Sequence, residues 1–423
     1  MKKSKTYKIL VANGAGYGNT GDEAQIDYSL AYLTKKYPLY QIVGLTPNVS
    51  YSKSIHPEFF WEYASRVLLY DQKRKGGCFT FKSSWTKIRF LFRSMIILLN
   101  AYLIKHDFPT IFINSDKSKF LFELANAELL VFSGGGYLTG ATLSRLWDGV
   151  ILCKLCEIFG IPVVMSGQTI GVWRNKFNQR LAKWGFKKVK VITTRDEEYS
   201  INDLKQIGIC GEHIFPTCDD ALFCKKYDKR CIDTENYITV NFHYWKMDEK
   251  TKGEIIDKLH AIISFICDTT SFNLIFIPMH ASDKDSFDDY IKKYPNNRFT
   301  CFSYDYDFKK VRRVIADSCA CITMKHHPII FAMGENIPVI SMAYSDYYIH
   351  KNQGALAQYH MDKYSVNLEH NDCIEKFKIL FEDMGNSLES IKATIAQRKE
   401  VLKTRQDKFY SLVDNILQKT VGI

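Results

Sequence analysis

The chain has 423 residues, 46% of them hydrophobic and 24% charged. It is therefore long enough for two or three packed domains of about 150 residues each, and its charge content is that of an ordinary soluble globular protein. The net charge of +11 favours anionic partners such as phosphorylated metabolites or an anionic membrane surface. No nucleic-acid-binding motif is present, so we expect no nucleic acid partner. The first apolar run is shorter than the roughly 7–15 residues of a signal peptide, so we expect a cytoplasmic protein with reduced cysteines.

Short apolar, β-branched runs alternate with longer helical stretches along the chain. This alternation predicts an α/β protein with parallel sheets and helices on both faces. A polar, charged stretch at 225–235 separates the two halves. We expect an N-terminal Rossmann-like domain at 1–228, a C-terminal Rossmann-like domain at 229–365, and a C-terminal helical segment at 366–423 that packs on the domains. The expected strands are YKILVAN, ELLVFS, PVVMSG, VKVITT, YITVNFH, NLIFIPMH, CITM and IPVISMA.

A glycine-rich turn, NGAGYGNTGDEA, follows the first expected strand. Gly14, Gly16 and Gly18 partly match a dinucleotide-binding fingerprint. However, Asp22 and Glu23 place negative charge at the start of the next helix, where it opposes a pyrophosphate. The sequence leaves three other roles open for these carboxylates: capping the helix, accepting hydrogen bonds from sugar hydroxyls, or removing a proton from a hydroxyl.

A basic insertion is expected at about residues 73–105, within the first domain. Seven lysines and arginines, at positions 73, 74, 75, 82, 87, 89 and 93, precede a mostly apolar run at 94–104. That run is too short for a transmembrane helix, which needs about 20 residues. Two interpretations stay open: a segment that lies in a membrane interface, or a helix packed on the sheet after a solvated basic loop.

Polar residues follow the next expected strands. Gly134–Gly136 follow LLVFS, and glycines there let a ligand or another backbone segment come close. Gln168 ends the next strand. Arg195 follows VITT and can hold a carboxylate or phosphate through two parallel hydrogen bonds, or form a salt bridge with an acid such as Asp196.

The sharpest motif of the second half is MKHHPIIFA. Lys325, His326 and His327 lie between an expected strand and a helix with Pro328 in its first turn. Cations beside a helix N-terminus favour anions, and a histidine there is suited to general acid catalysis near neutral pH. Lys351, in the following YYIHKNQG segment, is a second candidate anion ligand.

Polar residues and glycines thus follow expected strands in both halves. His243 and His280 also end such strands. Because ligands bind at the carboxyl ends of strands in open α/β sheets, two such domains facing each other would bring both sets to one inter-domain cleft. The sequence therefore predicts an enzyme or a ligand-binding protein.

In their order and spacing, these segments resemble the polysaccharide pyruvyl transferase family. The matching pieces within residues 7–365 are GNTGDEA, SGGGYL, GQTIG, TTRDEEYSINDLKQIG, CDDALF, KHHPIIFAMGENIPVI and YIHKNQG. The resemblance implies a glycosyltransferase-B-like fold with the ligand between two domains. It implies transfer of pyruvate from phosphoenolpyruvate onto two hydroxyls of a sugar as a ketal, in synthesis of a surface polysaccharide such as a capsule or exopolysaccharide. It further implies a glycan acceptor, often linked to polyprenyl diphosphate, at the inner face of the plasma membrane.

The resemblance also suggests roles for individual residues. His327 is the expected catalytic acid and Asp22 the expected base. Lys325 stands where the family usually has arginine, and a lysine cannot make the same two-pronged contact with an anion. The residues expected to bind phosphoenolpyruvate are Arg195, Lys325, His327 and Lys351. The residues expected on the acceptor side are Asn19, Asp22, Glu23, Gly135 and Gln168.

Two other functions stay open. One is a sugar-nucleotide-dependent glycosyltransferase of the same architecture, and the other is a non-catalytic glycan-binding homologue, which Lys325 in place of arginine invites. We expect no cofactor apart from phosphoenolpyruvate as co-substrate. We also expect no metal, because Cys153 and Cys156 form a lone CxxC within a helical pattern and read as buried thiols.

Overall fold

The computed structural model describes residues 7–13, 15–63, 84–244, 247–303, 305 and 307–421. Gly14 and the basic residues at 73, 74, 75 and 82 lie outside these ranges. The chain divides into two compact units. Unit 1 comprises Met1–Tyr17, Gln25–Asp220 and Arg405–Ile423, and unit 2 comprises Gly18–Ala24 and Ala221–Thr404. The main division therefore falls between Asp220 and Ala221, somewhat before the expected boundary at 228/229.

Contacts of the residues just after this division explain its position. The buried guanidinium of Arg312 in unit 2 donates hydrogen bonds to the Ala221 carbonyl and the Cys224 Sγ, both at 3.1 Å. Lys226 and Arg312 also share the Glu335 carboxylate. The segment from Ala221 onward is thus held by unit 2, although its polar composition resembles a linker.

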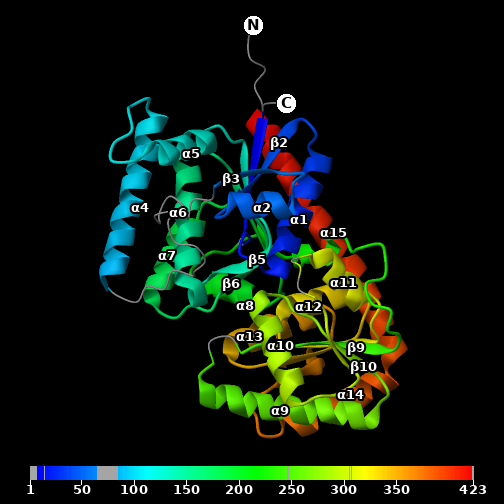
Figure 1. Ribbon diagram of the computed structural model, residues 1–423. Helices are drawn as coiled ribbons and strands as arrows, with labels where there is room; N and C mark the ends of the chain where they lie inside the picture. Colours follow the sequence, from blue (N-terminus) through cyan, green and yellow to red (C-terminus); the bar gives the residue numbers. More distant parts are fainter. Residues whose placement is uncertain are drawn as a thin grey trace. The chain divides into compact units, whose positions relative to one another are not determined.

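Unit 1 is built on a parallel sheet (Figure 1). In the described residues its strands run in the order β3-β2-β1-β4-β6-β7-β8, and β5 pairs with β6. Parallel neighbours need crossover connections, which the intervening helices supply. The strands are β1 (Tyr7–Ala12), β2 (Tyr40–Thr46), β3 (Phe60–Tyr63), β4 (Leu129–Phe132), β5 (Gly135–Thr139), β6 (Val163–Gly171), β7 (Val191–Thr194) and β8 (Ile214–Pro216).

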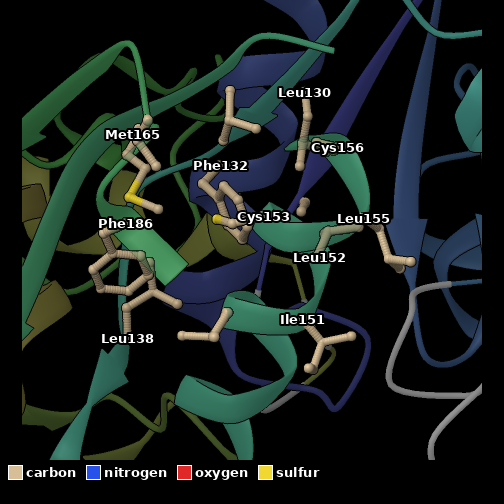
Figure 2. Close-up of a cluster of buried hydrophobic side chains, with 14 of the residues drawn as sticks. Leu130, Phe132, Leu138, Ile151, Leu152, Cys153, Leu155, Cys156, Met165 and Phe186 are labelled. Atoms are coloured by element: carbon tan, nitrogen blue, oxygen red, sulfur yellow. The ribbon is translucent and has the colours of Figure 1, made fainter. Parts of the chain in front are cut away.

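Strand β4, in the middle of this sheet, is apolar at every position because both of its faces are covered. In β4, Leu130 and Phe132 point into one hydrophobic cluster, while Leu129 and Val131 belong to the cluster on the opposite face. Figure 2 shows the first cluster, in which β4 side chains meet Met165 of β6 and residues of helix α6. The period of two along a strand thus divides one apolar run between two cores.

Helices cover both faces of the unit 1 sheet. α4 (Ser84–Lys105), α5 (Ser115–Ala125), α6 (Leu143–Phe159) and α7 (Lys176–Phe186) contribute to the first cluster. On the other face, α1 (Thr20–Lys36) packs with the end of α15 (Leu388–Val421), where Tyr32 stacks on Tyr410 at a centroid distance of 3.9 Å. Two shorter α-helices of this unit are α2 (Val49–Ile55) and α8 (Tyr199–Gln206).

Unit 2 has a second parallel sheet, in the order β11-β10-β9-β12-β13-β14. Its strands are β9 (Tyr237–Asn241), β10 (Asn273–Phe276), β11 (Phe299–Cys301), β12 (Ala320–Thr323), β13 (Val339–Ala343) and β14 (Ser365–Asn367). Its helices are α9 (Glu249–Thr269), α10 (Ala281–Lys293), α11 (Phe308–Ala316), α12 (His326–Gly334), α13 (Asp346–Ala357) and α14 (Cys373–Asn386). α9 contacts α14, and α12 contacts both α11 and α13 (Figure 1).

The prediction of two parallel α/β units with a helical C-terminus is confirmed. Each expected strand is present, as β1, β4, β6, β7, β9, β10, β12 and β13. Cys153 and Cys156 lie buried in α6, where burial raises the pKa of both thiols, so they pack as small apolar side chains. In the described ranges, no helix combines the length and the apolar character needed to cross a bilayer.

Candidate functional site

The candidate site lies in unit 2, at the carboxyl edge of its sheet. Here β9 is followed by His243, β10 by His280, and β12 by Lys325 and the start of α12. Because the strands are parallel, their carboxyl ends meet at one edge, so residues far apart in the sequence become neighbours. The loop that begins α12 is shaped by Thr323, whose hydroxyl accepts a hydrogen bond from the Lys325 N–H and donates one to the Lys325 carbonyl, both at 3.0 Å.

The ammonium group of Lys325 is paired with a carboxylate that the sequence did not point to. Its Nζ lies 2.6 Å from both carboxylate oxygens of Asp283, whose side chain is buried. Asp283 sits in the first turn of α10 and also accepts a hydrogen bond from the Met279 N–H at 2.9 Å. The positive charge of Lys325 is therefore largely neutralised by a group of its own unit.

The pKa of His243 is affected by both lysines of the site. Burial, together with the positive charges of Lys325 and Lys351, lowers the pKa of this histidine to about 3. Both lysines are thus within electrostatic reach of one imidazole, which is neutral at physiological pH. The ring of Tyr348, one turn before Lys351 on α13, lies 4.9 Å from the His243 ring.

The N-terminal glycine turn joins the same site, because Gly18–Ala24 belong to unit 2. The Thr20 N–H donates to the Met279 carbonyl at 3.0 Å, which attaches the start of α1 to the segment after β10. Asn19 caps α1: its Oδ1 accepts from the Gly21 N–H at 3.0 Å and from the Asp22 N–H at 3.3 Å. The capping role considered for Asp22 therefore falls to Asn19.

Gly21 lies directly against the imidazole of His327. A methyl group added at Gly21 would lie 1.9 Å from Nδ1 of His327, so only glycine leaves room for this ring. His327 is buried, with 7% of its surface exposed, in the first turn of α12, whose N-cap residue Lys325 makes no capping hydrogen bond through its side chain. The expected acid and the residue next to the expected base are therefore in contact.

The negative charge of Asp22 also affects the pKa of His280, the histidine that follows β10. Burial and Lys325 lower the pKa of His280, while the negative charges of Asp283 and Asp22 oppose that shift. The side chain of Asp22 is partly exposed, whereas that of Glu23 is buried. Asp22 is thus the carboxylate of the pair that a ligand from solvent can reach.

The expected residues of unit 1 gather around a second buried polar group. Arg195 is 2% exposed, and its Nη1 pairs with Asp219 while its Nε donates to Thr169 Oγ1 at 2.7 Å. Gln25 donates to both Asp219 oxygens at 2.8 Å. Nη2 of Arg195 is buried and has no hydrogen-bond partner in the part of the chain that the structure describes. The salt bridge considered for Arg195 is thus formed with Asp219, and one donor remains for a ligand.

The glycine loop after β4 packs on the protein itself. Asp220, fully buried, accepts from the Gly134 N–H at 2.7 Å and from the Ser166 hydroxyl at 2.6 Å. A methyl group at Gly135 would lie 2.3 Å from the Tyr137 ring, so that glycine is required by a neighbouring side chain. Gln168 is buried and donates to the Ser133 carbonyl at 2.6 Å. An acceptor-binding role for Gly135 and Gln168 stays a prediction.

The structure thus brings together one part of the predicted site. Asn19, Asp22, Glu23, Lys325, His327 and Lys351 lie in unit 2, and Arg195, Gly135 and Gln168 lie in unit 1. Convergence of the two groups on one ligand stays a prediction. The sequence analysis missed Asp283; the signal available was only that it follows a strand that ends in His280, within the first turn of a helix.

The described residues also contain a carboxylate and histidine trio in unit 1. Ligand atoms of Asp27, His56 and Glu58 lie within 4.8 Å of one another, with Asp27 and His56 buried and Glu58 exposed. His56 Nδ1 is 3.2 Å from Asp27 Oδ1. None of the residues predicted for the site belongs to this trio, and the expectation of a metal-free reaction stays a prediction.

A family model for polysaccharide pyruvyl transferase matches residues 19–346, which include the unit 2 site and the polar group around Arg195. The chain belongs to the polysaccharide pyruvyl transferase family. The match begins at Asn19, the residue that caps α1, and it extends past His327 to the start of α13. Membership in this family supports a transferase of polysaccharide biosynthesis. A comparison with curated proteins found no match.

Solved structures with a similar fold include two UDP-N-acetylglucosamine 2-epimerases. The enzyme from Rickettsia bellii is 12% identical with a TM-score of 0.55, covering 98% of each chain. That from Methanocaldococcus jannaschii is 12% identical with a TM-score of 0.52, covering 89% of this chain and 92% of its own. HepE of Anabaena, solved with UDP-glucose, is 11% identical with a TM-score of 0.53, covering 98% of this chain and 100% of its own. At this identity the likeness establishes only that this pyruvyl transferase family member has a glycosyltransferase-B-like fold.

Proposed function

We propose that this protein transfers the pyruvyl group of phosphoenolpyruvate to two hydroxyls of one sugar as a cyclic ketal and releases phosphate. The observation that supports it most is the contact of Gly21 with His327, since it places the candidate acid beside the turn that carries the candidate base, Asp22. Family membership supplies the reaction class. The glycan acceptor, in a surface polysaccharide or its lipid-linked precursor, belongs to the same proposal.

The chemistry assigns a step to each of these groups. Asp22 removes the proton of the first hydroxyl as its oxygen bonds to C2 of phosphoenolpyruvate, and His327 donates a proton to C3, which becomes a methyl group. The bond from C2 to the phosphate oxygen then breaks, and phosphate leaves with its electron pair. The second hydroxyl bonds to C2 and gives its proton to the His327 imidazole, while Asp22 releases the first proton to the phosphate, so that the ketal is closed and both groups are restored. Atoms balance without a redox step or a further co-reactant.

The charges of the unit 2 site fit one anionic end of the donor. Lys351 and the N-terminus of α12 present positive potential, whereas Lys325 is paired with Asp283. Lys325 would therefore bind phosphate weakly unless the ligand draws it away from Asp283. Arg195, with its remaining Nη2 donor, is the group proposed for the other anionic end.

The test is phosphate release from phosphoenolpyruvate by the purified protein, with and without a membrane-lipid extract of its own host. We expect release only in the presence of the extract, and a mass increase of the acceptor that corresponds to a ketal. His327→Ala should lower turnover by about 10²–10⁴-fold, the usual contribution of one acid or base. His370→Ala, which removes an exposed histidine of the same unit, is the matched control and should leave turnover unchanged.

Two results would contradict the proposal. One is near-normal turnover of His327→Ala, which removes this histidine from the mechanism. The other is the absence of both phosphate release and thermal stabilisation by phosphoenolpyruvate. The similar Anabaena structure was solved with UDP-glucose, so stabilisation by UDP or GDP instead would favour the sugar-nucleotide glycosyltransferase. Stabilisation by a glycan alone would favour a binding protein.

A further inference from the structure

Helix α4 carries two apolar faces, of which one packs on unit 1 and the other is exposed among the residues that the structure describes. The inner face consists of Phe90, Ser94, Ile97, Ala101 and Ile104, which recur every three or four positions and are all buried. The exposed apolar side chains recur with the same period on the opposite side, so they form a second continuous stripe. This outer face consists of Trp85, Ile88, Leu91, Phe92, Met95, Leu99 and Tyr102.

The inner face is held firmly against unit 1. Phe90 packs edge-on against Trp147 of α6 at a centroid distance of 5.1 Å, and the Trp147 indole N–H donates to Ser94 Oγ at 3.1 Å. Asn100 donates to the Ile111 carbonyl at 2.8 Å and accepts from the Ile111 N–H at 2.7 Å. The helix therefore has a defined orientation, and its outer face points away from the core of unit 1. α4 lies at the edge of unit 1 away from α1 and α15 (Figure 1).

The outer face is a continuous apolar surface, whereas most protein surfaces expose apolar side chains singly. Trp85 is 80% exposed, Phe92 62% and Met95 59%, and the stripe runs the length of a helix of 22 residues, about 33 Å. Continuous apolar surface on this scale marks an interaction site.

The charge of the residues around α4 indicates what binds to its outer face. Between Gln72 and His106 the sequence has eight lysines and arginines and no aspartate or glutamate. Of these, Arg89 and Lys105 are exposed beside the outer face of α4 and Arg93 is partly exposed. Two copies of this chain pairing through α4 would bring these like charges together, which disfavours a dimer. An anionic lipid surface instead attracts them.

The composition of the outer face fits a bilayer interface. Trp85 and Tyr102 both lie on it, and these two side chains favour the boundary between water and hydrocarbon, where a helix that lies flat would hold them. The side chains between them are aliphatic, Phe or Met. We propose that the outer face of α4 lies flat in the interface of an anionic membrane, with the basic side chains at the lipid phosphates.

The test is flotation of the whole protein with phosphatidylcholine vesicles that contain or lack a quarter phosphatidylglycerol. We expect flotation with the anionic vesicles, weaker flotation at high salt because the charges are screened, and little with pure phosphatidylcholine. Phe92→Ser combined with Met95→Ser should weaken binding by at least about tenfold, because two buried apolar side chains are lost. Leu39→Ser and Ile379→Ser are the matched controls, since both remove exposed apolar side chains outside α4 and should bind as the wild type does.

A second measurement locates the contact on α4. Brominated lipids should quench tryptophan fluorescence on binding, and Trp85→Phe should remove most of that quenching while flotation is retained. Thermal unfolding of each variant shows that it is folded. The proposal is overturned if the wild type does not float with anionic vesicles, or if the Phe92 and Met95 double variant floats equally well. A dimer in light scattering that the same double variant dissociates, without vesicle binding, would assign the face to a second copy.

Discussion

Histidine chemistry in unit 2 is set by what surrounds each ring. His243 is almost fully buried, and burial together with the charges of Lys325 and Lys351 keeps it neutral. For His280, two carboxylates oppose the effect of burial. His327 has Gly21 against one side of its ring and lies in the first turn of α12. Proton transfer to substrate by His327 therefore stays a proposal, while burial and the charges of Lys325 and Lys351 hold His243 neutral.

The low pKa of His243 predicts a loss of stability in mild acid. Its pKa is lowered from 6.5 to about 3 in the folded protein, so below pH 6.5 the unfolded chain binds a proton that the folded chain does not. Stability should therefore fall as the pH drops from 6.5 towards 3, by up to about 1.4 kcal/mol per pH unit from this group. Urea unfolding at pH 7 and pH 5.5 measures the slope. His243→Gln should flatten it, and an unchanged slope in this variant would contradict the assignment.

The contact of Gly21 with His327 predicts a specific effect of one methyl group. Gly21→Ala should displace the imidazole and lower turnover nearly as far as His327→Ala, about 10²–10⁴-fold, because the proton is no longer delivered to C3. Gly253→Ala in α9 is the control: apart from its chain neighbours and the backbone of its own helix, no described atom lies within 4 Å of the added methyl, and alanine should stabilise that helix slightly. Separate measurement of kcat and of the melting temperature distinguishes the two effects. A Gly21→Ala protein that melts earlier but turns over normally would refute the role of this contact.

At the scale of elements, the expected strands share one property: their apolar runs are buried on both faces of a sheet. The strands that sequence analysis missed lack such runs. β3 is a four-residue edge strand with Phe60 exposed, and β8, β11 and β14 have three residues each. The apolar run of β2 is interrupted by Gly44, which pairs with Trp61 of β3. Glycine leaves room for the Trp61 ring, because a methyl group at Gly44 would lie 2.5 Å from that ring. A glycine that serves a neighbouring strand reads as a strand breaker until the pairing is known.

The ends of β7 and β8 are joined by a buried ion pair that predicts a large stability effect. Arg195 follows β7, and Asp219 follows β8; both side chains are buried. Asp219→Asn leaves the guanidinium charge uncompensated and should lower the free energy of unfolding by about 3–5 kcal/mol. Glu197→Gln, which breaks the exposed pair with Arg405, should cost at most about 1 kcal/mol. Chemical denaturation at pH 7 compares them, and equal losses would show that burial of the first pair is not what matters.

At the scale of the whole molecule, the sequence predicted the two sheets and the unit 2 motifs, but not which residues distant in the sequence contact one another. MKHHPIIFA could be placed after a strand because strand and helix patterns are local. The pairing of Lys325 with Asp283 could not be predicted, because the two residues are 42 positions apart and both are of types that usually lie on the surface. The neighbours of Gly21 were likewise hidden, because the first residues of α1 belong to a unit whose other residues begin at Ala221.

The assignment of Gly18–Ala24 to unit 2 has a consequence for any attempt to express one unit from a part of the gene. A clone of residues 221–404 would encode Lys325, His327 and Lys351 without the peptide that carries Asn19, Gly21 and Asp22. Its imidazole would lose the glycine beside it, and the proposed reaction would lose its carboxylate. Recombination between relatives at the Asp220–Ala221 junction would likewise separate the proposed acid from the proposed base. Crossovers that keep 18–24 and 221–404 from one parent would leave both in place.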